Sequence, residues 1–580
     1  MTHVPPAVLP RPGSNLDRFV HAQFSHLTGG ISPAALAMAF DDWLMHLSHN
    51  PAEQAELAQA WLDAWARLPG LLLEAGRPAG RPGIEAAVQD HRFDHPGWQA
   101  WPFNVMSQSF LLTEAWWKAA TTGVHGVSRH HENVVSFTVR QLLDVLSPAN
   151  FPWANPEVLE RTAQTGGANL VEGLRNLMAD ARHLQSESPP PGAEHFRVGH
   201  EVAVTPGQVI FRNRLIELIQ YAPAGPQVRP EPVLLVPSWI MKYYILDLSP
   251  ANSLVRFLVE QGYTVFAISW ANPGPEGRDL GMDDYLRLGV MDALDAVAAV
   301  VPGQRIHATG YCLGGTLLAI AAAAMGRDGD ERLASVSMLA AQTDFTEPGE
   351  LALFIDNSQV SFLEDIMWDR GYLDTTQMAG AFQLLNSRDL VWSRMLKDYL
   401  MGERRPMSDL MAWNVDGTRL PYRMHAEYLR RLFLDNDLAS GRYPVGDRPV
   451  ALTDITCEIF CVSTLRDHVA PWRSVHKLHY LTTAELHFVL TSGGHNAGIV
   501  SEPGHPKRHY ALLACGAEDP WMSPDDWQRA APRHEGSWWT AWHDWLLAHG
   551  SGRQVPAREI APEAALMPAP GEYVMVRYPD

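Results

Sequence analysis

The stretch IHATGYCLGGTLLAIAAAAM, residues 306–325, decides the fold of this chain. It opens as an apolar strand, turns sharply at GYCLG (310–314) and continues as an apolar helix. This is the strand–turn–helix setting of the G-x-S-x-G nucleophile elbow, with Cys312 in the place of serine. The glycines suit such a turn, because a Cβ at either flank would clash with neighbouring backbone. Taken alone, the short motif fits a buried cysteine in a glycine-rich turn equally well.

The helix that follows Cys312 has two chemical consequences. Its dipole favours a thiolate over a thiol at the N-terminus. The same N-terminus offers the backbone N–H of Leu313 to a developing oxyanion. A second oxyanion donor is expected in the loop PSWIMK (237–242) after the strand 233–236. We expect the N–H of Ile240 to fill this role, with that of Trp239 as the alternative.

The order of three residues along the chain supports the elbow. An acid that follows the nucleophile, and a histidine after both, are typical of this fold. Asp467 comes just after the predicted strand 459–463, and His495 just after the predicted strand 486–490. Open α/β sheets place their sites at these carboxyl ends of strands.

Each of the two residues has a chemical role and a simpler alternative. His495 is the expected general base because its unperturbed pKa lies near neutrality. Asp467 would orient His495 or help it to activate a hydroxyl. The alternatives are a surface histidine at a glycine turn and an aspartate that caps a turn. The role of His468, next to Asp467, stays open.

Strands and helices alternate in the second half of the chain. Continuous apolar runs are typical of strands covered on both faces, and helical patterns such as 285–301 lie between several of them. The alternation predicts the α/β-hydrolase fold, a mostly parallel sheet with helices on both faces. The predicted strands are 233–236, 265–270, 306–309, 336–341, 459–463 and 486–490.

The chain divides into segments that differ in composition and in predicted secondary structure. Ser32 is the expected N-cap of the first helix, and SESPPPGA (186–193) is typical of a linker. A stretch rich in Trp, Met and Tyr interrupts the strand–helix alternation, and we expect it to form a helical lid. The expected segments are a flexible leader (1–30), a short helical N-terminal segment (31–68), a mainly helical N-terminal domain (84–195) and the α/β-hydrolase catalytic domain (196–580) with its lid insertion at about 345–448.

Composition excludes several classes of protein. The net charge of −20 over 580 residues argues against nucleic-acid binding, which needs a basic face. Four cysteines are too few for disulfide bonds to stabilise the fold of a chain of this size. Cys457 and Cys461 fall in a predicted strand and are expected to be a small buried pair, so no metal site is predicted. The sequence shows no secretory signal and no transmembrane stretch, and predicts a reduced cytoplasmic protein.

Long motifs give the sequence a specific resemblance. Beside GYCLGGT (310–316), the chain contains stretches that are similar to those of the polyhydroxyalkanoate synthases, closest to their class I type. Met241 stands where the family usually has Asn, and the run 496–500 after His495 is unusual, so a divergent paralogue is the alternative. The other stretches are LSPANFPWANPEVL (146–159), TGGANLVEGLRN (165–176), TPGQVIFRNRLIELIQY (205–221), KYYILDLSPANSLVRFLVEQGYTVFAISWANP (242–273), DLVW (389–392) and GSWW (536–539).

The resemblance implies a reaction and a setting. Cys312 would carry the acyl group, His495 would be the base, and Asp467 would help to activate the hydroxyl of the growing chain. The substrate would be (R)-3-hydroxyacyl-CoA and the product polyhydroxyalkanoate, with CoA released and no cofactor needed. The family works in the cytoplasm at the surface of polyester granules, commonly as a homodimer.

The choice of cysteine gives an independent argument for acyl transfer. An acyl-cysteine is still a thioester, so transfer of the acyl group from CoA to Cys312 changes the bond energy little. The favourable conversion of a thioester to an ester is then left for the attack by a hydroxyl. Two alternatives stay open: a cysteine-dependent acyl-CoA thioesterase or esterase on the same fold, and a non-catalytic granule-associated protein. The intact order of Cys312, Asp467 and His495 argues against the second.

Overall fold

The computed structural model describes residues 14–74, 90–186, 189–374, 391–516 and 519–577. The chain divides into two compact units. The sheet unit contains Met1–Gly30, Gly192–Thr376 and Met407–Asp580, and the helical unit contains Ile31–Pro191 and Gln377–Pro406. Parts of the predicted leader (1–13), linker (187–188), helical domain (84–89), lid (375–390) and DLVW motif (389–390) lie outside the described residues.

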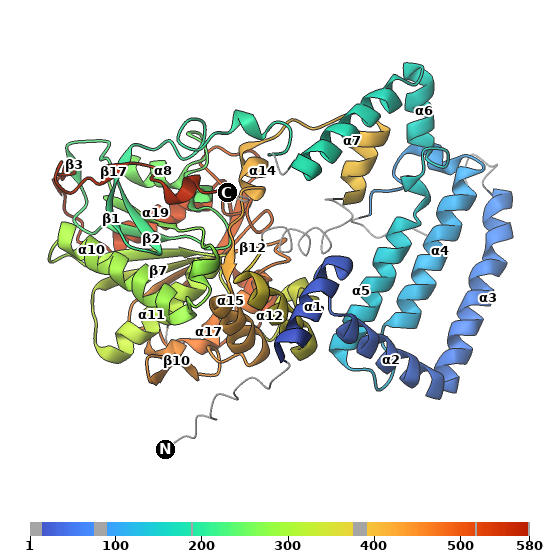
Figure 1. Ribbon diagram of the computed structural model, residues 1–580, viewed down its shortest axis with the longest axis horizontal. Helices are drawn as coiled ribbons and strands as arrows, with labels where there is room; N and C mark the ends of the chain where they lie inside the picture. The colour runs from blue at the N-terminus through green and yellow to red at the C-terminus, as the bar shows by residue number, and fades with distance from the viewer. Residues whose placement is uncertain (1–13, 75–89, 187–188, 375–390, 517–518, 578–580) are drawn as a thin grey trace. The chain divides into compact units, whose positions relative to one another are not determined.

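A mixed sheet forms the centre of the sheet unit (Figure 1). Within the described residues it has 11 strands in the order β15-β14-β13-β12-β7-β6-β4-β5-β2-β1-β17. The strands from β13 to β5 in this order run parallel, and the flanking strands are antiparallel. The bounds are β1 Gly207–Arg212, β2 Ile216–Tyr221, β4 Val233–Val236, β5 Val265–Trp270, β6 Ile306–Tyr311, β7 Leu333–Leu339, β12 Ile459–Thr464, β13 Leu486–Thr491, β14 His509–Cys515, β15 Arg533–Glu535 and β17 Met567–Pro568.

The six parallel strands are the six that the sequence predicts, so that prediction is confirmed. Every residue of β4, β5, β6 and β12 is buried, which explains why these strands are mostly apolar. A short separate pair joins β3 (Gln227–Val228) to β16 (Val555–Pro556).

Helices cover both faces of this sheet. On one face α11 (Leu313–Asp328) packs against β6 and β7, and in Figure 1 it crosses in front of the strands together with α10 (Asp292–Val300). On the other face α8 (Leu254–Glu260) and α19 (Trp538–Ala548) join strand residues in one hydrophobic cluster. The helix predicted at 285–301 is a π-helix over Tyr285–Met291 followed by α10. Shorter helices are α9 (Met282–Asp284), α16 (Trp472–Val475), α17 (Leu478–Leu481) and α18 (Pro524–Ala530).

The prediction of a flexible leader is wrong for part of its length. Helix α1 spans Ser14–Thr28 and packs against α12 (Asn357–Arg370). Nδ1 of His21 lies 2.7 Å from Oδ2 of Asp365, and Nε of Arg18 lies 3.4 Å from Oδ1 of the same residue. The prolines that suggested disorder all precede this helix, whose polar side finds a partner in α12.

The predicted lid insertion is mainly helical, and it is divided between the two units. Its described part in the sheet unit has α12, α14 (Asp409–Asn414), α15 (Tyr422–Tyr428) and a π-helix η10 (Leu429–Leu434). Short strands also occur there as the pairs β8–β9 (Tyr372–Leu373, Leu420–Pro421) and β10–β11 (Tyr443–Val445, Arg448–Val450). Residues 391–406, including the π-helix η9 (Met395–Leu400), belong to the helical unit instead.

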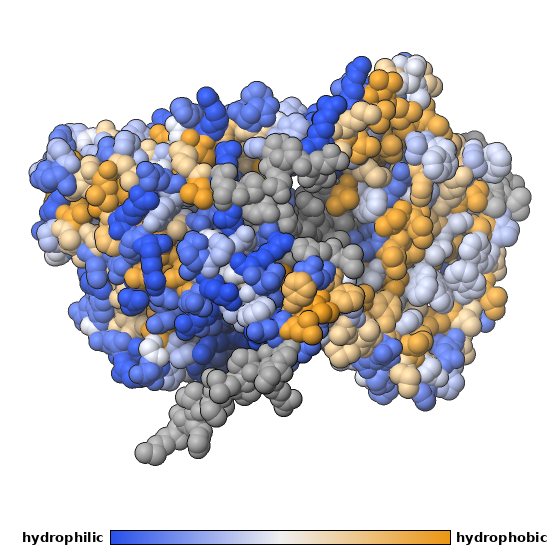
Figure 2. Space-filling view, in the orientation of Figure 1, coloured by the Kyte–Doolittle hydropathy of each residue, from blue (hydrophilic) through white to orange (hydrophobic). Residues whose placement is uncertain are grey.

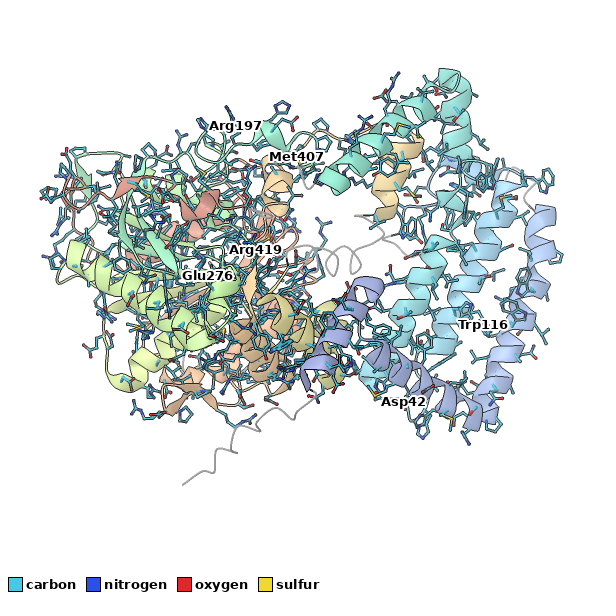
Figure 3. All side chains as sticks on the ribbon, viewed as in Figure 1. Asp42, Trp116, Arg197, Glu276, Met407 and Arg419 are labelled. Carbon is cyan, nitrogen blue, oxygen red and sulfur yellow. The ribbon has the colours of Figure 1, made fainter. Side chains whose placement is uncertain are left out.

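The helical unit joins the predicted short segment and the predicted N-terminal domain. Ser32 caps its first helix as predicted, because Oγ accepts the N–H of Ala35. The helices are α2 (Pro33–His49), α3 (Pro51–Glu74), α4 (Phe103–Thr121), α5 (Arg129–Val145), α6 (Pro156–Thr165) and α7 (Ala168–Ser186), with η9 packed on α7. Oδ2 of Asp42 on α2 lies 2.6 Å from Nδ1 of His131 on α5, and the indole N–H of Trp116 on α4 donates to the carbonyl oxygen of Leu57 on α3. Asp42 and Trp116 are labelled in Figure 3. No helix in the described ranges has both the length and the apolarity needed to cross a membrane.

Candidate active site

Cys312 sits in a strained turn between β6 and α11. Its backbone has φ 52° and ψ −123°, a conformation that L-residues other than glycine rarely adopt. Its N–H donates to the carbonyl of Leu339 on β7, and its carbonyl accepts the N–H of Gly315. The side chain is half-buried at the N-terminus of α11. This is the nucleophile elbow that the sequence predicts.

The glycines of the elbow are required by close packing. A Cβ on Gly310 would overlap the backbone of Gly315, and one on Gly314 would overlap the carbonyl oxygen of Val236. A Cβ on Gly315 would lie 2.5 Å from that of Ala341. The helix N-terminus therefore lies directly against the end of β4, where the loop with the candidate oxyanion donors begins.

Asp467 is a buried carboxylate with hydrogen-bond partners on both of its oxygens. Its Oδ1 accepts the N–H groups of Val469 and Ala470 at 2.9 and 2.8 Å. Its Oδ2 accepts the hydroxyl of Thr464 at 3.2 Å and lies 2.8 Å from Nδ1 of His495. Burial favours the neutral acid, but His495 and these backbone donors outweigh it and lower the pKa of Asp467.

His495 connects Asp467 to Cys312. Burial opposes its charged form, yet Asp467 and Cys312 together raise the pKa of His495 well above its usual value, by charge and by hydrogen bonding. Because Nδ1 faces Asp467, Nε2 is the nitrogen left for the sulfur of Cys312. The structure thus brings all three predicted residues together. His468 makes no comparable contact with Asp467 among the described residues.

Two tryptophans hold the loop that follows His495. The indole N–H of Trp538 donates to the carbonyl of Gly498, and that of Trp539 donates to the carbonyl of Ile499, both at 3.0 Å. The GSWW motif therefore fixes the histidine loop from α19. Both side chains are buried, as amphipathic indoles with a satisfied N–H can be.

Residues that the sequence did not single out complete the site. Asn496 accepts a hydrogen bond of 2.6 Å from the hydroxyl of Tyr311 and donates to Oδ1 of Asn414 at 3.2 Å. Tyr428 ends α15 and is buried, and both burial and the charge of Cys312 raise its pKa. The sequence signal for Tyr311 is its position next to Cys312, and the signals for Asn496 are its position next to His495 and the unusual run 496–500. No pattern in the sequence around Asn414 or Tyr428 indicates that either residue belongs to the site.

The predicted oxyanion donors are backbone N–H groups at the start of α11 and in the loop after β4. In the part of the chain that the structure describes, the N–H of Leu313 has no acceptor. The N–H of Ile240, the donor expected from the sequence, instead donates to Oγ of Ser238 at 3.3 Å. The N–H of Trp239 has no acceptor among the described residues, which makes it the better candidate.

Cys457 and Cys461 are buried, unlike the half-buried Cys312. Burial raises the pKa of Cys457 to about 11 and that of Cys461 further still, so neither is a ready nucleophile. Cys461 lies in β12, but Cys457 precedes the strand, so the expectation that both share it is wrong for Cys457. Over the described ranges, no group of three or more His, Cys, Asp or Glu side chains is arranged to hold a metal ion.

Comparison with known proteins decides the family. Residues 89–258 match the "Poly-beta-hydroxybutyrate polymerase (PhaC) N-terminus" family, residues 11–52 match "Poly-beta-hydroxybutyrate polymerase N terminal", and residues 231–502 match the α/β hydrolase fold family. A poly(3-hydroxyalkanoate) polymerase of Methylorubrum extorquens is 38% identical over 98% of this chain and 92% of its own length. The chain belongs to the poly(3-hydroxyalkanoate) polymerase family. It is therefore a transferase built on the α/β-hydrolase fold, as the sequence predicts.

Other members of the polymerase family show similar coverage. The poly(3-hydroxyalkanoate) polymerase subunit PhaC of Cupriavidus necator is 32% identical over 96% of this chain and 94% of its own. That of Rhizobium meliloti is 34% identical over 93% and 88%. Among solved structures, a monoacylglycerol lipase of Paleococcus ferrophilus covers 58% of this chain and 99% of its own, with 13% identity and a TM-score of 0.33.

Proposed function

We propose that this polymerase joins (R)-3-hydroxyacyl-CoA thioesters into polyhydroxyalkanoate, with Cys312 as the covalent nucleophile and CoA as the leaving group. The observation that carries the proposal is the relay from Asp467 through His495 to Cys312. The acyl-CoA substrate and the polyester product follow from the family.

The relay suits the acylation of Cys312. His495 takes the thiol proton, and the sulfur attacks the carbonyl carbon of the acyl-CoA. The N–H groups of Leu313 and Trp239 would bind the resulting oxyanion. The C–S bond to CoA then breaks, and His495 returns the proton to the departing CoA sulfur. The products are acyl-Cys312 and free CoA.

Chain extension uses the same residues. A hydroxyl of a second hydroxyacyl group attacks the thioester of acyl-Cys312 while His495 accepts the hydroxyl proton. The new ester leaves, and the Cys312 sulfur recovers the proton. Asp467 supports this harder deprotonation by stabilising the imidazolium. Because loading exchanges one thioester for another, the favourable change to an ester is kept for this step.

Exclusion of water distinguishes a polymerase from a thioesterase. Tyr428 from the insertion lies within electrostatic reach of Cys312, and Asn414 hydrogen-bonds Asn496 beside His495. These contacts support a lid role for the described part of the insertion. Such a cover would protect acyl-Cys312 from hydrolysis through repeated additions.

The helical unit offers a surface for the water-insoluble product. Apolar residues gather over α4 to α7 on the face shown in Figure 2. Soluble proteins rarely expose contiguous apolar patches of large size without an interaction partner. We assign this surface to contact with the polyester granule. Exposed large apolar side chains in this part of the chain include Trp101, Leu142, Leu146, Trp153, Val171 and Leu174.

Trapping the covalent intermediate tests the proposal. The protein is mixed with (R)-3-hydroxybutyryl-CoA, quenched in acid and digested, and the peptides are analysed by mass spectrometry. We expect one hydroxybutyryl group or a short oligomer on the peptide with Cys312, and none in Cys312→Ala. Acylation of another residue at the same rate as CoA release would contradict the proposal.

A further inference from the structure

Lys242 is a buried lysine at the end of the loop 237–242, which carries the candidate oxyanion donors. Only 3% of its surface is exposed, although lysine is rarely buried without a partner. Its Nζ donates to the carbonyl oxygen of Val576 at 2.6 Å and to that of Tyr573 at 3.3 Å. Its direct partners are thus carbonyls of the C-terminal tail, which we define as residues 567–577.

The C-terminal tail has its own anchors on the sheet. Its first residues form β17, which pairs with β1. Further along, the buried carboxylate of Glu217 on β2 accepts the N–H groups of Glu572 and Tyr573, both at 3.0 Å. The side chain of Val574 is buried as well. The tail is therefore held to the edge of the sheet without Lys242.

The loop itself is held on another side by the insertion. The indole N–H of Trp413 donates to the carbonyl of Lys242 at 2.7 Å. Thr418 donates its N–H to the carbonyl of Ile240 at 3.0 Å and its hydroxyl to the carbonyl of Trp239. These hydrogen bonds hold the carbonyl groups of the loop, and the side chain of Lys242 holds the end of the loop to the tail.

Asn272, in the loop after β5, connects the tail and the insertion. Its Nδ2 donates to the carbonyl of Val576 at 3.3 Å, and its Oδ1 accepts the N–H of Arg419 at 2.9 Å. Arg419 is marked in Figure 3. The carbonyl oxygen of Val576 thus accepts hydrogen bonds from Lys242 and from Asn272, which lie in two different loops at the carboxyl end of the sheet.

The surroundings of Lys242 act on its pKa in opposite directions. Burial lowers its pKa to about 8, while the carboxylate of Asp416 opposes this fall and the guanidinium groups of Arg577 and Arg419 add to it. Asp416 is itself held by the hydroxyl of Tyr244 at 2.8 Å. A protonated amine has three donors, enough for both tail carbonyls.

We propose that Lys242 is a positioning residue that ties the oxyanion loop to the C-terminal tail and so sets the loop N–H toward the carbonyl oxygen of the acyl group on Cys312. This inference rests on the proposed function. Since the tail is anchored to the sheet by Glu217 and β17, the bond from Lys242 gives the side of the loop that the insertion does not hold a fixed point of attachment. A displacement of about 1 Å in such a donor is enough to slow a reaction roughly 10²-fold.

The test compares two reactions of the same sulfur. Acylation by (R)-3-hydroxybutyryl-CoA passes through an oxyanion, whereas alkylation by iodoacetamide does not. Single-turnover acylation and alkylation of Cys312 are followed by mass spectrometry in Lys242→Met, Lys242→Arg and Lys507→Met. The last removes the same charge from an exposed lysine. A chain that ends at Met575 is the second variant, because it removes the Val576 carbonyl and leaves Lys242 in place.

We expect Lys242→Met to slow acylation roughly 10²-fold while alkylation stays within about twofold of the unaltered protein. Lys242→Arg should recover part of the rate, the shortened chain should repeat the selective loss, and Lys507→Met should change neither reaction. Unchanged acylation, or an equal fall in both reactions, overturns the inference. If Lys242→Met does not fold, the rates of acylation and alkylation of Cys312 in the shortened chain test the inference instead. Absence of acylation in the unaltered protein would instead refute the proposed function.

Discussion

Oδ2 of Asp467 lies 2.8 Å from Nδ1 of His495, although 28 positions separate them in the sequence. The register of two strands creates this contact. β12 and β13 are parallel neighbours whose last residues, Thr464 and Thr491, pair with each other. Asp467 and His495 leave these two strands at the same edge of the sheet, beside the turn that ends β6 at Cys312. The site is therefore a direct consequence of parallel pairing.

Replacement of Cys312 tests its role as nucleophile. We expect Cys312→Ala to lower CoA release roughly 10⁵-fold or more, a loss similar in size to that caused by removing the nucleophile of a serine protease. Cys312→Ser should retain only a trace, because a hydroxyl is a weaker nucleophile than a thiolate. CoA release is measured by chromatography. Labelling of Cys457 or Cys461 that abolishes activity while Cys312 stays unmodified would contradict this.

Asp467→Asn should separate the two half-reactions. A thiol gives up its proton more readily than an alcohol, so Cys312 should still be acylated in this variant. Chain extension should fall roughly 10⁴-fold, because the imidazolium that it requires loses its carboxylate. Quenched samples should then accumulate acyl-Cys312, which mass spectrometry detects. Normal extension would show that Asp467 is not the acid of the relay.

The protonation of His495 should depend on both of its partners. Since Asp467 and Cys312 raise its pKa, Cys312→Ala should lower that pKa and Asp467→Asn should lower it further. The group's contribution to stability is present below the unfolded pKa of histidine and is lost as the pH rises through the folded pKa. NMR titration of the imidazole in the three proteins measures the order. A pKa that is unchanged in Cys312→Ala would refute the contact with the sulfur.

Packing at the elbow predicts a position-specific effect of alanine. Gly314→Ala should lower the free energy of unfolding by about 3 kcal/mol, because the new Cβ meets the carbonyl of Val236. Acylation should be lost as the elbow shifts. The control Gly225→Ala adds a methyl group to open space and should change stability by less than about 0.5 kcal/mol. Chemical denaturation measures both. Equal stability of the two variants would contradict the packing argument.

The sequence predicts the centre of this protein well because local pattern and tertiary structure agree there. A strand buried on both faces is mostly apolar, and the short run 233–236 matches this pattern of a central strand. The motif around Cys312 needs glycines for steric reasons that are local to the turn. Chain order then suffices to place Asp467 and His495 opposite it.

Features that depend on distant partners could not be predicted in this way. Helix α1 exists against α12, more than three hundred positions away, and no signal within 14–28 indicates that partner. Glu217 is a buried acid in β2 whose partners are N–H groups of the C-terminal tail. The engagement of the Ile240 N–H by Ser238 is a detail of loop conformation. Each follows from tertiary contacts that residue pattern does not encode.

The product made from (R)-3-hydroxybutyryl-CoA tests the central claim most directly. The purified protein is incubated with this thioester, and CoA, free 3-hydroxybutyrate and insoluble polyester are each quantified over the same time course. We predict that almost every CoA released is matched by one monomer in polyester, with little free acid, because acyl-Cys312 is passed to a hydroxyl rather than to water. One free acid for each CoA, with no polymer at any time, would contradict the account and identify the protein as a thioesterase that uses the same three residues.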